Sequence, residues 1–163
     1  MSYGSPALTT PLVVWRIDHE KFASDCASGH GAFIVGGRWN PKGYATVYSS
    51  IDAATTILES AVHKGFHVLD TVPHVLTAFE IADPIDVYVV KNAAVPNPNW
   101  LHPGVISPGQ QQYGKAVMES YAFVALPSVV SKNSWNVIFN PTKAAGKFKQ
   151  VHQERFSLDT RLV

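Results

Sequence analysis

Six short runs of β-branched and aromatic residues are spread along the chain, and they constrain the fold more than any other feature. Such runs, bounded by turn-forming residues, predict β-strands. They lie at residues 12–17, 46–48, 75–81, 86–90, 123–127 and 135–139. Helical patterns stand between only two neighbouring pairs of runs, at about residues 50–64 and 110–120. Because strands and helices do not alternate regularly, we expect an α+β fold with a mixed, mostly antiparallel sheet.

The length of 163 residues is sufficient for one compact domain with its own core. We expect residues 1–11 to be a flexible N-terminus, because they are mostly small or polar, and residues 12–163 to form the domain. The glycine-rich stretch from residue 18 to 46 is predicted to be a long loop. Residues 156–162 alternate apolar and polar side chains, which predicts a last strand that closes the sheet.

The predicted helix over about residues 50–64 carries an apolar stripe with a carboxylate at its edge. Ile51, Ala54, Leu58 and Val62 fall on one narrow arc at helical spacing. We expect this arc to face the core. Glu59 then lies at the border of the arc, where its carboxylate can point into a cleft beside the core.

Charge and cysteine content exclude several classes of protein. Thirteen basic and twelve acidic residues give a net charge of +1, which argues against nucleic-acid binding through a broad basic face. Cys26 is the only cysteine and cannot form an internal disulfide, so we expect a reducing compartment such as the cytoplasm. No apolar stretch is long enough for a membrane span. The charged fraction of 15% is low and suggests that a partner covers apolar surface.

Two motifs that would imply nucleotide or metal binding are interpreted as coincidences. Residues 109–115 have the spacing of a phosphate-binding P-loop, but Ala116 stands where a Mg²⁺-binding Ser or Thr is needed. A proline-rich stretch, not a strand, precedes them. His63 and His67 are four residues apart, but Gly65 stands between them and no third ligand is evident. We therefore predict no metal site.

The segment from Gly36 to Gly43, with the sequence GGRWNPKG, is the strongest candidate for a binding turn. Its paired glycines let the backbone approach a ligand, and Arg38 offers a planar donor fork suited to phosphate. Tyr48 follows ten residues after Arg38, and Glu59 eleven residues after Tyr48. A strand followed by a helix would bring these three side chains to one cleft. The alternative is a structural turn with Arg38 in a surface salt bridge.

A second polar group stands later in the chain. Ser128 follows Pro127 at the end of one predicted strand, and Asn136 and Asn140 flank the next. Loop serines and asparagines are usually turn formers, and by themselves these residues are interpreted in that way.

Taken together, these motifs resemble those of the RES-domain family, which is named for a shared arginine, glutamate and serine. The resemblance covers about residues 12–162. It rests on residues 36–43, Tyr48, Glu59, residues 126–128 and 136–141, the ending at 156–162, and Arg16 in the first strand. One departure is Thr142-Lys143, which stands where relatives often carry a histidine nearby. It puts in doubt only a role for such a histidine.

The resemblance implies the toxin of a bacterial type II toxin–antitoxin pair, located in the cytoplasm, with a fold similar to ADP-ribosyltransferase toxins. It implies growth arrest through cleavage of NAD⁺ between nicotinamide and ribose. Family members are described as NAD⁺ phosphorylases, NAD⁺ glycohydrolases and, in some cases, protein ADP-ribosyltransferases. Inorganic phosphate, water and a protein side chain therefore all stay open as the acceptor, and a binding module without chemistry stays open as well.

The expected partners are an Xre-type antitoxin and NAD⁺ as substrate. No cofactor, no direct nucleic-acid contact and no membrane contact are expected, and a homo-oligomer within the complex stays open. The resemblance carries catalytic roles to Arg38, Tyr48, Glu59 and Ser128. Glu59 would stabilise the developing ribosyl cation, and Arg38 would bind the diphosphate or a phosphate. Tyr48 and Ser128 would contact the ribose or nicotinamide. Substrate-binding roles are expected at Arg16, Gly37, Trp39, Asn40 and Asn140.

Overall fold

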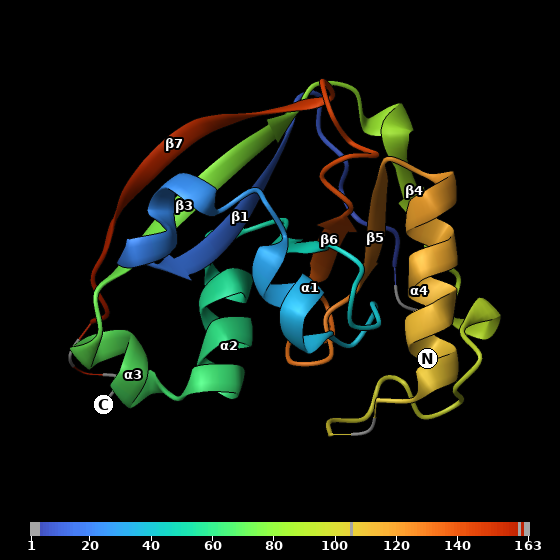
Figure 1. Cartoon of the computed structure of the whole chain (residues 1–163), viewed down its shortest axis with the longest axis horizontal. Helices are drawn as coiled ribbons and strands as arrows, with labels where there is room; N and C mark the ends of the chain where they lie inside the picture. Colours follow the sequence, from blue (N-terminus) through green and yellow to red (C-terminus); the bar gives the residue numbers. More distant parts are fainter. Residues whose placement is uncertain (1–3, 105, 160, 162–163) are drawn as a thin grey trace.

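One curved sheet of seven strands forms the framework of the computed structural model, which describes residues 4–104, 106–159 and 161 (Figure 1). The strands are β1 (Leu12–His19), β2 (Val47–Ser50), β3 (His74–Ile81), β4 (Val87–Val89), β5 (Phe123–Pro127), β6 (Trp135–Phe139) and β7 (Phe148–Phe156). Their order across the sheet is β4-β5-β6-β2-β1-β3-β7. Only β4 and β5 run parallel, and the other neighbours are antiparallel. The predicted α+β domain with a mixed, mostly antiparallel sheet is confirmed.

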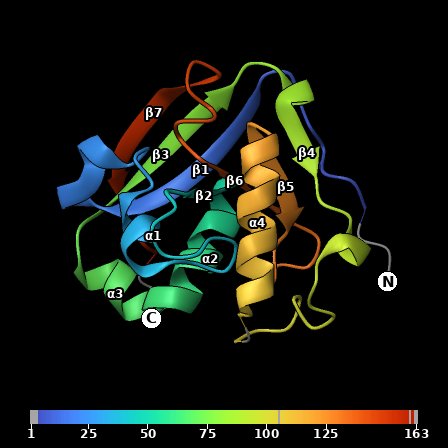
Figure 2. The same ribbon diagram turned by 45° about the vertical axis from the view of Figure 1, so that its right-hand side comes forward.

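Helices cover the sheet at two places (Figures 1 and 2). They are α1 (His30–Val35), α2 (Ala53–Lys64), α3 (Phe66–Thr71) and α4 (Pro108–Ser120), with 3₁₀ turns η1 (Glu20–Asp25), η2 (Pro84–Asp86) and η3 (Asn92–Ala94). Helix α4 lies along the β4-β5-β6 half, and α2 and α3 lie beside β1. Within the described part of the chain, no helix combines the length and apolarity that crossing a membrane requires.

Three apolar clusters hold these layers together. The largest joins the two halves of the sheet, with Phe79, Phe123 and Phe139 in edge-to-face contact. A second cluster lies under α4 around Met118, and a third lies under α2 and α3 around Leu69. The candidate site lies between α2, the strands β2 and β6 and the end of β5.

The start of α2 differs from the prediction. Ser50 belongs to β2, where it pairs with Asn136, so the helix begins only at Ala53. Asp52 is the N-cap, and its carboxylate accepts a hydrogen bond from the Thr55 backbone N–H at 2.7 Å.

The buried face of α2 also differs from the prediction. Leu58 is 41% exposed and Val62 is 62% exposed, so the part of the predicted arc that lies on α2 faces outward, whereas Ile51 before the helix packs against the core. The buried residues include Thr56, whose hydroxyl donates to the Trp15 carbonyl at 2.8 Å. Small, hydrogen-bonded side chains let the helix lie directly on β1, and this packing outweighs the apolar periodicity.

The C-terminal segment 156–162 and the segment 18–46 need corrections as well. The predicted strand over residues 156–162 is wrong, because β7 already ends at Phe156 after pairing with the whole of β3; residues 160 and 162 lie outside the described part. The segment 18–46 is not a continuous loop, because it contains η1 and α1. Residues 1–3 of the expected flexible N-terminus are also not described, and Leu8 packs against the core.

Candidate active site

A chain of hydrogen bonds links α2 to strands β2, β5 and β6. Oε1 of Glu59 accepts one hydrogen bond from the Ser128 hydroxyl at 2.7 Å and another from Nδ2 of Asn136 at 2.6 Å. The Ser50 hydroxyl in turn donates to Oδ1 of Asn136 at 2.8 Å. Ser50 and Asn136 are directly paired residues of β2 and β6, so their side chains share one face of the sheet. The carboxylate is therefore held by two separate segments.

The second carboxylate oxygen of Glu59 is open. Within the described part of the chain, no protein group donates to Oε2, and this oxygen is not among the buried unpaired atoms. The Glu59 side chain thus has one anchored oxygen and one that solvent or a ligand can reach.

Ser128 is the buried residue that donates to the anchored oxygen of Glu59. It is fully buried, and its oxygen accepts from the backbone N–H groups of Val130 at 3.2 Å and Ser131 at 2.9 Å. Its single proton goes to Glu59. All hydrogen-bonding functions of the hydroxyl are used within the protein.

Arg38 lies within electrostatic range of Glu59. Its Nη1 donates to the Trp100 carbonyl at 3.1 Å, which ties the turn to the segment before α4. Partial burial lowers the pKa of the Arg38 guanidinium, and the negative charge of Glu59 acts in the opposite direction. Arginine remains charged under such shifts. The structure therefore brings a fixed positive charge near the Glu59 carboxylate.

Tyr48 fastens the glycine turn to β2. Its hydroxyl accepts from the Trp39 backbone N–H at 3.0 Å and donates to Oδ1 of Asn40 at 2.7 Å. Burial raises the pKa of Tyr48, which keeps the phenol neutral. A side chain at Gly37 would collide with the Tyr48 hydroxyl, so this position needs glycine.

Three residues expected to bind substrate build the turns around the site. Trp39 is 3% exposed and meets Trp100 edge-on, with ring centroids 5.2 Å apart. Asn40 is fully buried, and its amide group donates to three backbone carbonyls. Asn140 donates to the Ala45 carbonyl at 2.8 Å and accepts from two backbone N–H groups of its own turn. For all three, the hydrogen bonds and ring contact described here are made within the chain.

Arg16 forms an ion pair of its own. Its Nε donates to Oδ2 of Asp18 at 2.7 Å, and its Nη2 lies 2.5 Å from Oδ1 of the same carboxylate. Its Nη1 donates to the Tyr48 carbonyl at 3.1 Å. In the described residues, no hydrogen bond or ion pair links Arg16 with Arg38 or Glu59.

Ser50 and Asn136 are missing from the predicted site. The sequence does give a signal, since both are polar residues inside strands, two positions away from Tyr48 and Ile138 respectively. Their meeting could not be predicted, because the pairing of β2 with β6 joins residues 86 positions apart.

The P-loop alternative is excluded by the structure. Residues 109–115 lie entirely inside α4, where they form helix and not a phosphate-binding loop. The glycine at position 114 is required by packing, because a Cβ there would collide with the Trp39 carbonyl.

No group of three or more His, Cys, Asp or Glu side chains among the described residues could hold a metal ion. Cys26 is buried, and burial raises the pKa of its thiol.

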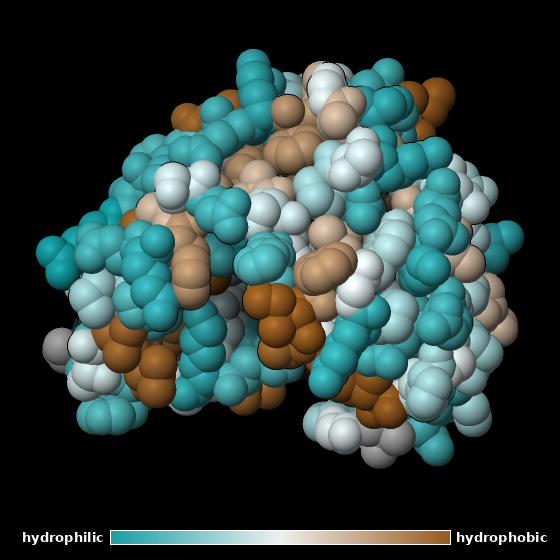
Figure 3. Space-filling model, viewed as in Figure 1, coloured by the Kyte–Doolittle hydropathy of each residue, from teal (hydrophilic) through white to brown (hydrophobic). Residues whose placement is uncertain are grey.

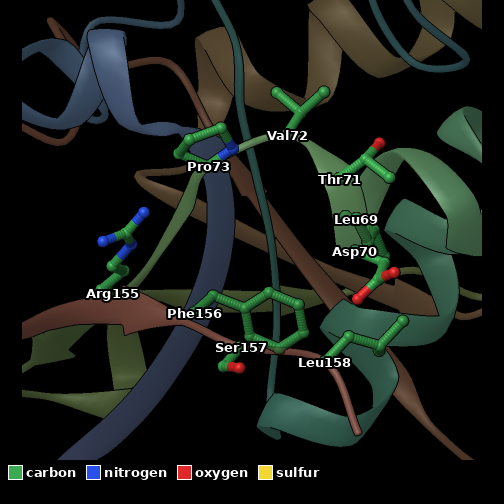
Figure 4. Close-up of a pocket in the computed structure, with 9 residues that line it drawn as sticks. All are labelled: Leu69, Asp70, Thr71, Val72, Pro73, Arg155, Phe156, Ser157 and Leu158. Carbon is green, nitrogen blue, oxygen red and sulfur yellow. The ribbon is translucent and has the colours of Figure 1, made fainter. Parts of the chain in front are cut away.

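The surface is hollowed in more than one place. In Figure 3 the lower outline is shallowly indented between the α2 side and the segment before α4. A separate hollow of about 410 Å³ lies where α3 and β7 end (Figure 4). It is lined by Leu69, Asp70, Thr71, Val72, Pro73, Arg155, Phe156, Ser157 and Leu158. None of the candidate site residues lines this second hollow.

Comparison with known proteins decides the family. Residues 13–159 match the RES domain. The chain belongs to the RES-domain family. This RES domain is 31% identical to a Sphingobium protein (strain YBL2) named "Prs ADP-ribosylating toxin", over 91% of the chain and 95% of that protein. It is 30% identical to a protein named "Toxin Res" from Photorhabdus laumondii subsp. laumondii (strain TT01), over 93% and 97%.

A solved structure shares the fold of this RES domain. It is a chain from the crystal structure of the M. tuberculosis MbcT–MbcA toxin–antitoxin complex, with a TM-score of 0.71. The alignment covers 90% of the RES domain and 85% of that chain at 17% sequence identity. At this identity the likeness establishes the fold alone.

Proposed function

We propose that this RES domain is the toxin of a bacterial toxin–antitoxin pair and cleaves the bond between nicotinamide and ribose in NAD⁺. The observation that carries the proposal is the Glu59 carboxylate, which has one anchored oxygen, one open oxygen and the Arg38 charge within range. The toxin names of two relatives that align over nearly the whole chain support the biological role.

Cleavage of the nicotinamide–ribose bond requires a negative charge near the ribose rather than a general acid that protonates the leaving group. Nicotinamide leaves as a neutral molecule from a cationic pyridinium, and positive charge develops on the ribose as in glycoside hydrolysis. A preorganised carboxylate stabilises such a charge effectively in a partly dry site. Oε2 of Glu59 would face the ribose and accept a hydrogen bond from a ribose hydroxyl. Arg38 would bind the diphosphate or an incoming phosphate.

The acceptor is either inorganic phosphate or water. The two products are ADP-ribose-1″-phosphate and ADP-ribose, which mass spectrometry separates. The test is to incubate purified protein with NAD⁺, with and without inorganic phosphate, and to measure nicotinamide release and product mass. Absence of nicotinamide release under both conditions would contradict the proposal and favour a binding module.

Protein ADP-ribosylation is the second candidate. It is favoured by one observation, the name "Prs ADP-ribosylating toxin" of the Sphingobium relative. Here a protein side chain replaces phosphate or water as acceptor, and Glu59 keeps the same task. NAD⁺ labelled in its adenine ring, added to a bacterial lysate with the toxin, would transfer label to a protein band. A Glu59→Gln protein serves as the control.

An antitoxin, of Xre type, is the proposed partner, with the bacterial cytoplasm as the location. Support comes from the fold shared with a chain of a toxin–antitoxin complex and from the low charged fraction of 15%. The antitoxin would cover the surface around Arg38 and Glu59. The purified complex should then release no nicotinamide, whereas the free toxin should. An active complex would contradict direct occlusion, and light scattering of the complex would give its stoichiometry.

A further inference from the structure

We infer that Asn136, oriented by Ser50, is a positioning residue that fixes Oε1 of Glu59 together with Ser128 and leaves Oε2 as the single oxygen offered to the substrate. The identity of that substrate rests on the proposed function. The arrangement of the three supporting side chains rests on the structure alone.

The orientation of the Asn136 amide is decided by its neighbour. The Ser50 hydroxyl donates to Oδ1, so the amide oxygen faces β2 and the amide nitrogen faces Glu59. Ser50 is only 2% exposed and is itself fixed by pairing with Trp15 of β1 and Asn136 of β6. Three strands therefore determine where the donor to Glu59 lies.

Ser128, directly after β5, donates to the same oxygen. Because its oxygen already accepts two backbone N–H groups of its own turn, its proton is directed at Glu59. The hydroxyl is fully buried and has no remaining donor for a ligand. In this arrangement Ser128 acts on the substrate through Glu59, as a second positioning residue.

Two donors on one oxygen have a directional effect. They restrict the rotation of the carboxylate, so the lone pairs of Oε2 point in one direction. Arg38 is the charged side chain that interacts with this carboxylate. The neutral donors thus set the direction of the carboxylate, and Arg38 supplies the opposite charge.

The test observes the hydrogen bonding of the Glu59 carboxylate directly and needs no activity. The chain has only five glutamates, at positions 20, 59, 80, 119 and 154, so ¹³C-carboxyl NMR at one neutral pH resolves them and Glu59→Gln assigns the resonance. Asn136→Ala removes a donor to Oε1 and should move the carboxyl chemical shift of Glu59. Asn136→Asp replaces the donor by a like charge and should move it further.

A double-variant comparison separates positioning from general damage to the sheet. Ser50→Ala should move the Glu59 carboxyl chemical shift in the native background and have no effect in the Asn136→Ala background, because Ser50 acts through Asn136. Ser49→Ala is the matched control. Ser49 is the neighbouring residue, is also buried, and donates to β6 at 2.6 Å, but to the Val137 carbonyl. Ser49→Ala should leave the Glu59 carboxyl chemical shift unchanged.

The outcomes distinguish this inference from the proposed function. If neither Asn136 variant moves the Glu59 carboxyl chemical shift in folded protein, or if Ser49→Ala moves it as much as Ser50→Ala, the positioning role is wrong. If the chemical shifts move as expected but native protein releases no nicotinamide from NAD⁺, the positioning stands and the proposed reaction fails. If both hold, Asn136→Ala should lower kcat for nicotinamide release more than it changes KM.

Discussion

The Tyr48 hydroxyl and the Trp39 backbone N–H are joined by a hydrogen bond of 3.0 Å, which fastens the glycine turn to the centre of the sheet. The same hydroxyl donates to Asn40, so one phenol holds two successive residues of the turn. Arg38 directly precedes them. The position of the guanidinium relative to Glu59 therefore depends on a side chain that need not touch substrate.

Tyr48→Phe should lower the free energy of unfolding by about 1–3 kcal/mol, because it leaves a buried N–H and a buried amide oxygen without their partner. Urea denaturation monitored by tryptophan fluorescence measures this. Tyr121→Phe, at a side chain that is 45% exposed, is the control and should change little. Equal stability of the Tyr48 and Tyr121 variants would show that the phenol does not fasten the turn.

Glu59→Gln should reduce nicotinamide release from NAD⁺ by about 10²-fold or more, because it keeps the shape of the side chain and removes its charge. Initial rates by chromatography give the comparison, and Glu59→Ala should abolish the reaction. Glu119→Gln, on the exposed side of α4, is the matched control and should keep full activity. A folded Glu59→Gln protein that consumes NAD⁺ at the native rate would contradict the catalytic role of Glu59.

Arg38→Lys should weaken NAD⁺ binding on the order of tenfold, because a lysine keeps the charge but loses the planar fork and the bond to the Trp100 carbonyl. The readout is KM in the nicotinamide assay. Lys42→Ala, an exposed cation of the same turn, should leave KM unchanged. An unchanged KM for Arg38→Lys would mean that the guanidinium does not bind the diphosphate.

Gly114→Ala should destabilise the protein by about 1–3 kcal/mol, because the new methyl group collides with the Trp39 carbonyl. Gly109→Ala is the matched control in the same helix, since the nearest atoms to its added Cβ are 4.0 Å away. Thermal unfolding of the two variants gives the difference. Equal unfolding temperatures of the two variants would show that α4 is not closely packed against the backbone of Trp39 at Gly114.

Acidification should destabilise the protein through His74. Burial lowers the pKa of this histidine, and the charges of Lys64 and His19 act in the same direction. The unfolded chain then binds a proton at a higher pH than the native state does, so the free energy of unfolding falls as pH drops below about 6.5. Urea denaturation from about pH 7.5 to about pH 5 measures this slope. His74→Gln should flatten the slope, whereas His63→Gln, at an exposed position, should not.

Local patterns in the sequence were sufficient for most of the elements. The β-branched runs predicted β1 to β6, and the turn chemistry around Gly36–Gly43 predicted the segment that carries Arg38. The tail was mistaken for a strand, because its alternation has the right period but β3 is already paired along its whole length by β7. Alternation in sequence says nothing about whether a partner edge is free.

The face of α2 shows the same limit. Its apolar residues at helical spacing predict a buried stripe, yet Leu58 and Val62 are exposed and Thr56 is buried against β1. Which face a helix buries depends on the surface that receives it, here the backbone of β1, and that surface exists only in the assembled sheet.

By itself the sequence determined strands β1 to β6, helices α2 and α4 and the residue types of the candidate site, because these follow from local propensity and spacing along the chain. Strand β7 was not predicted from the sequence. Only the tertiary structure decided what Glu59 contacts. Ser128 and Asn136 are 69 and 77 residues away from it, and the contacts exist because β2, β5 and β6 are neighbours in the sheet. Hydrogen bonds act over about 3 Å, so their partners are chosen by strand order, which no local pattern encodes.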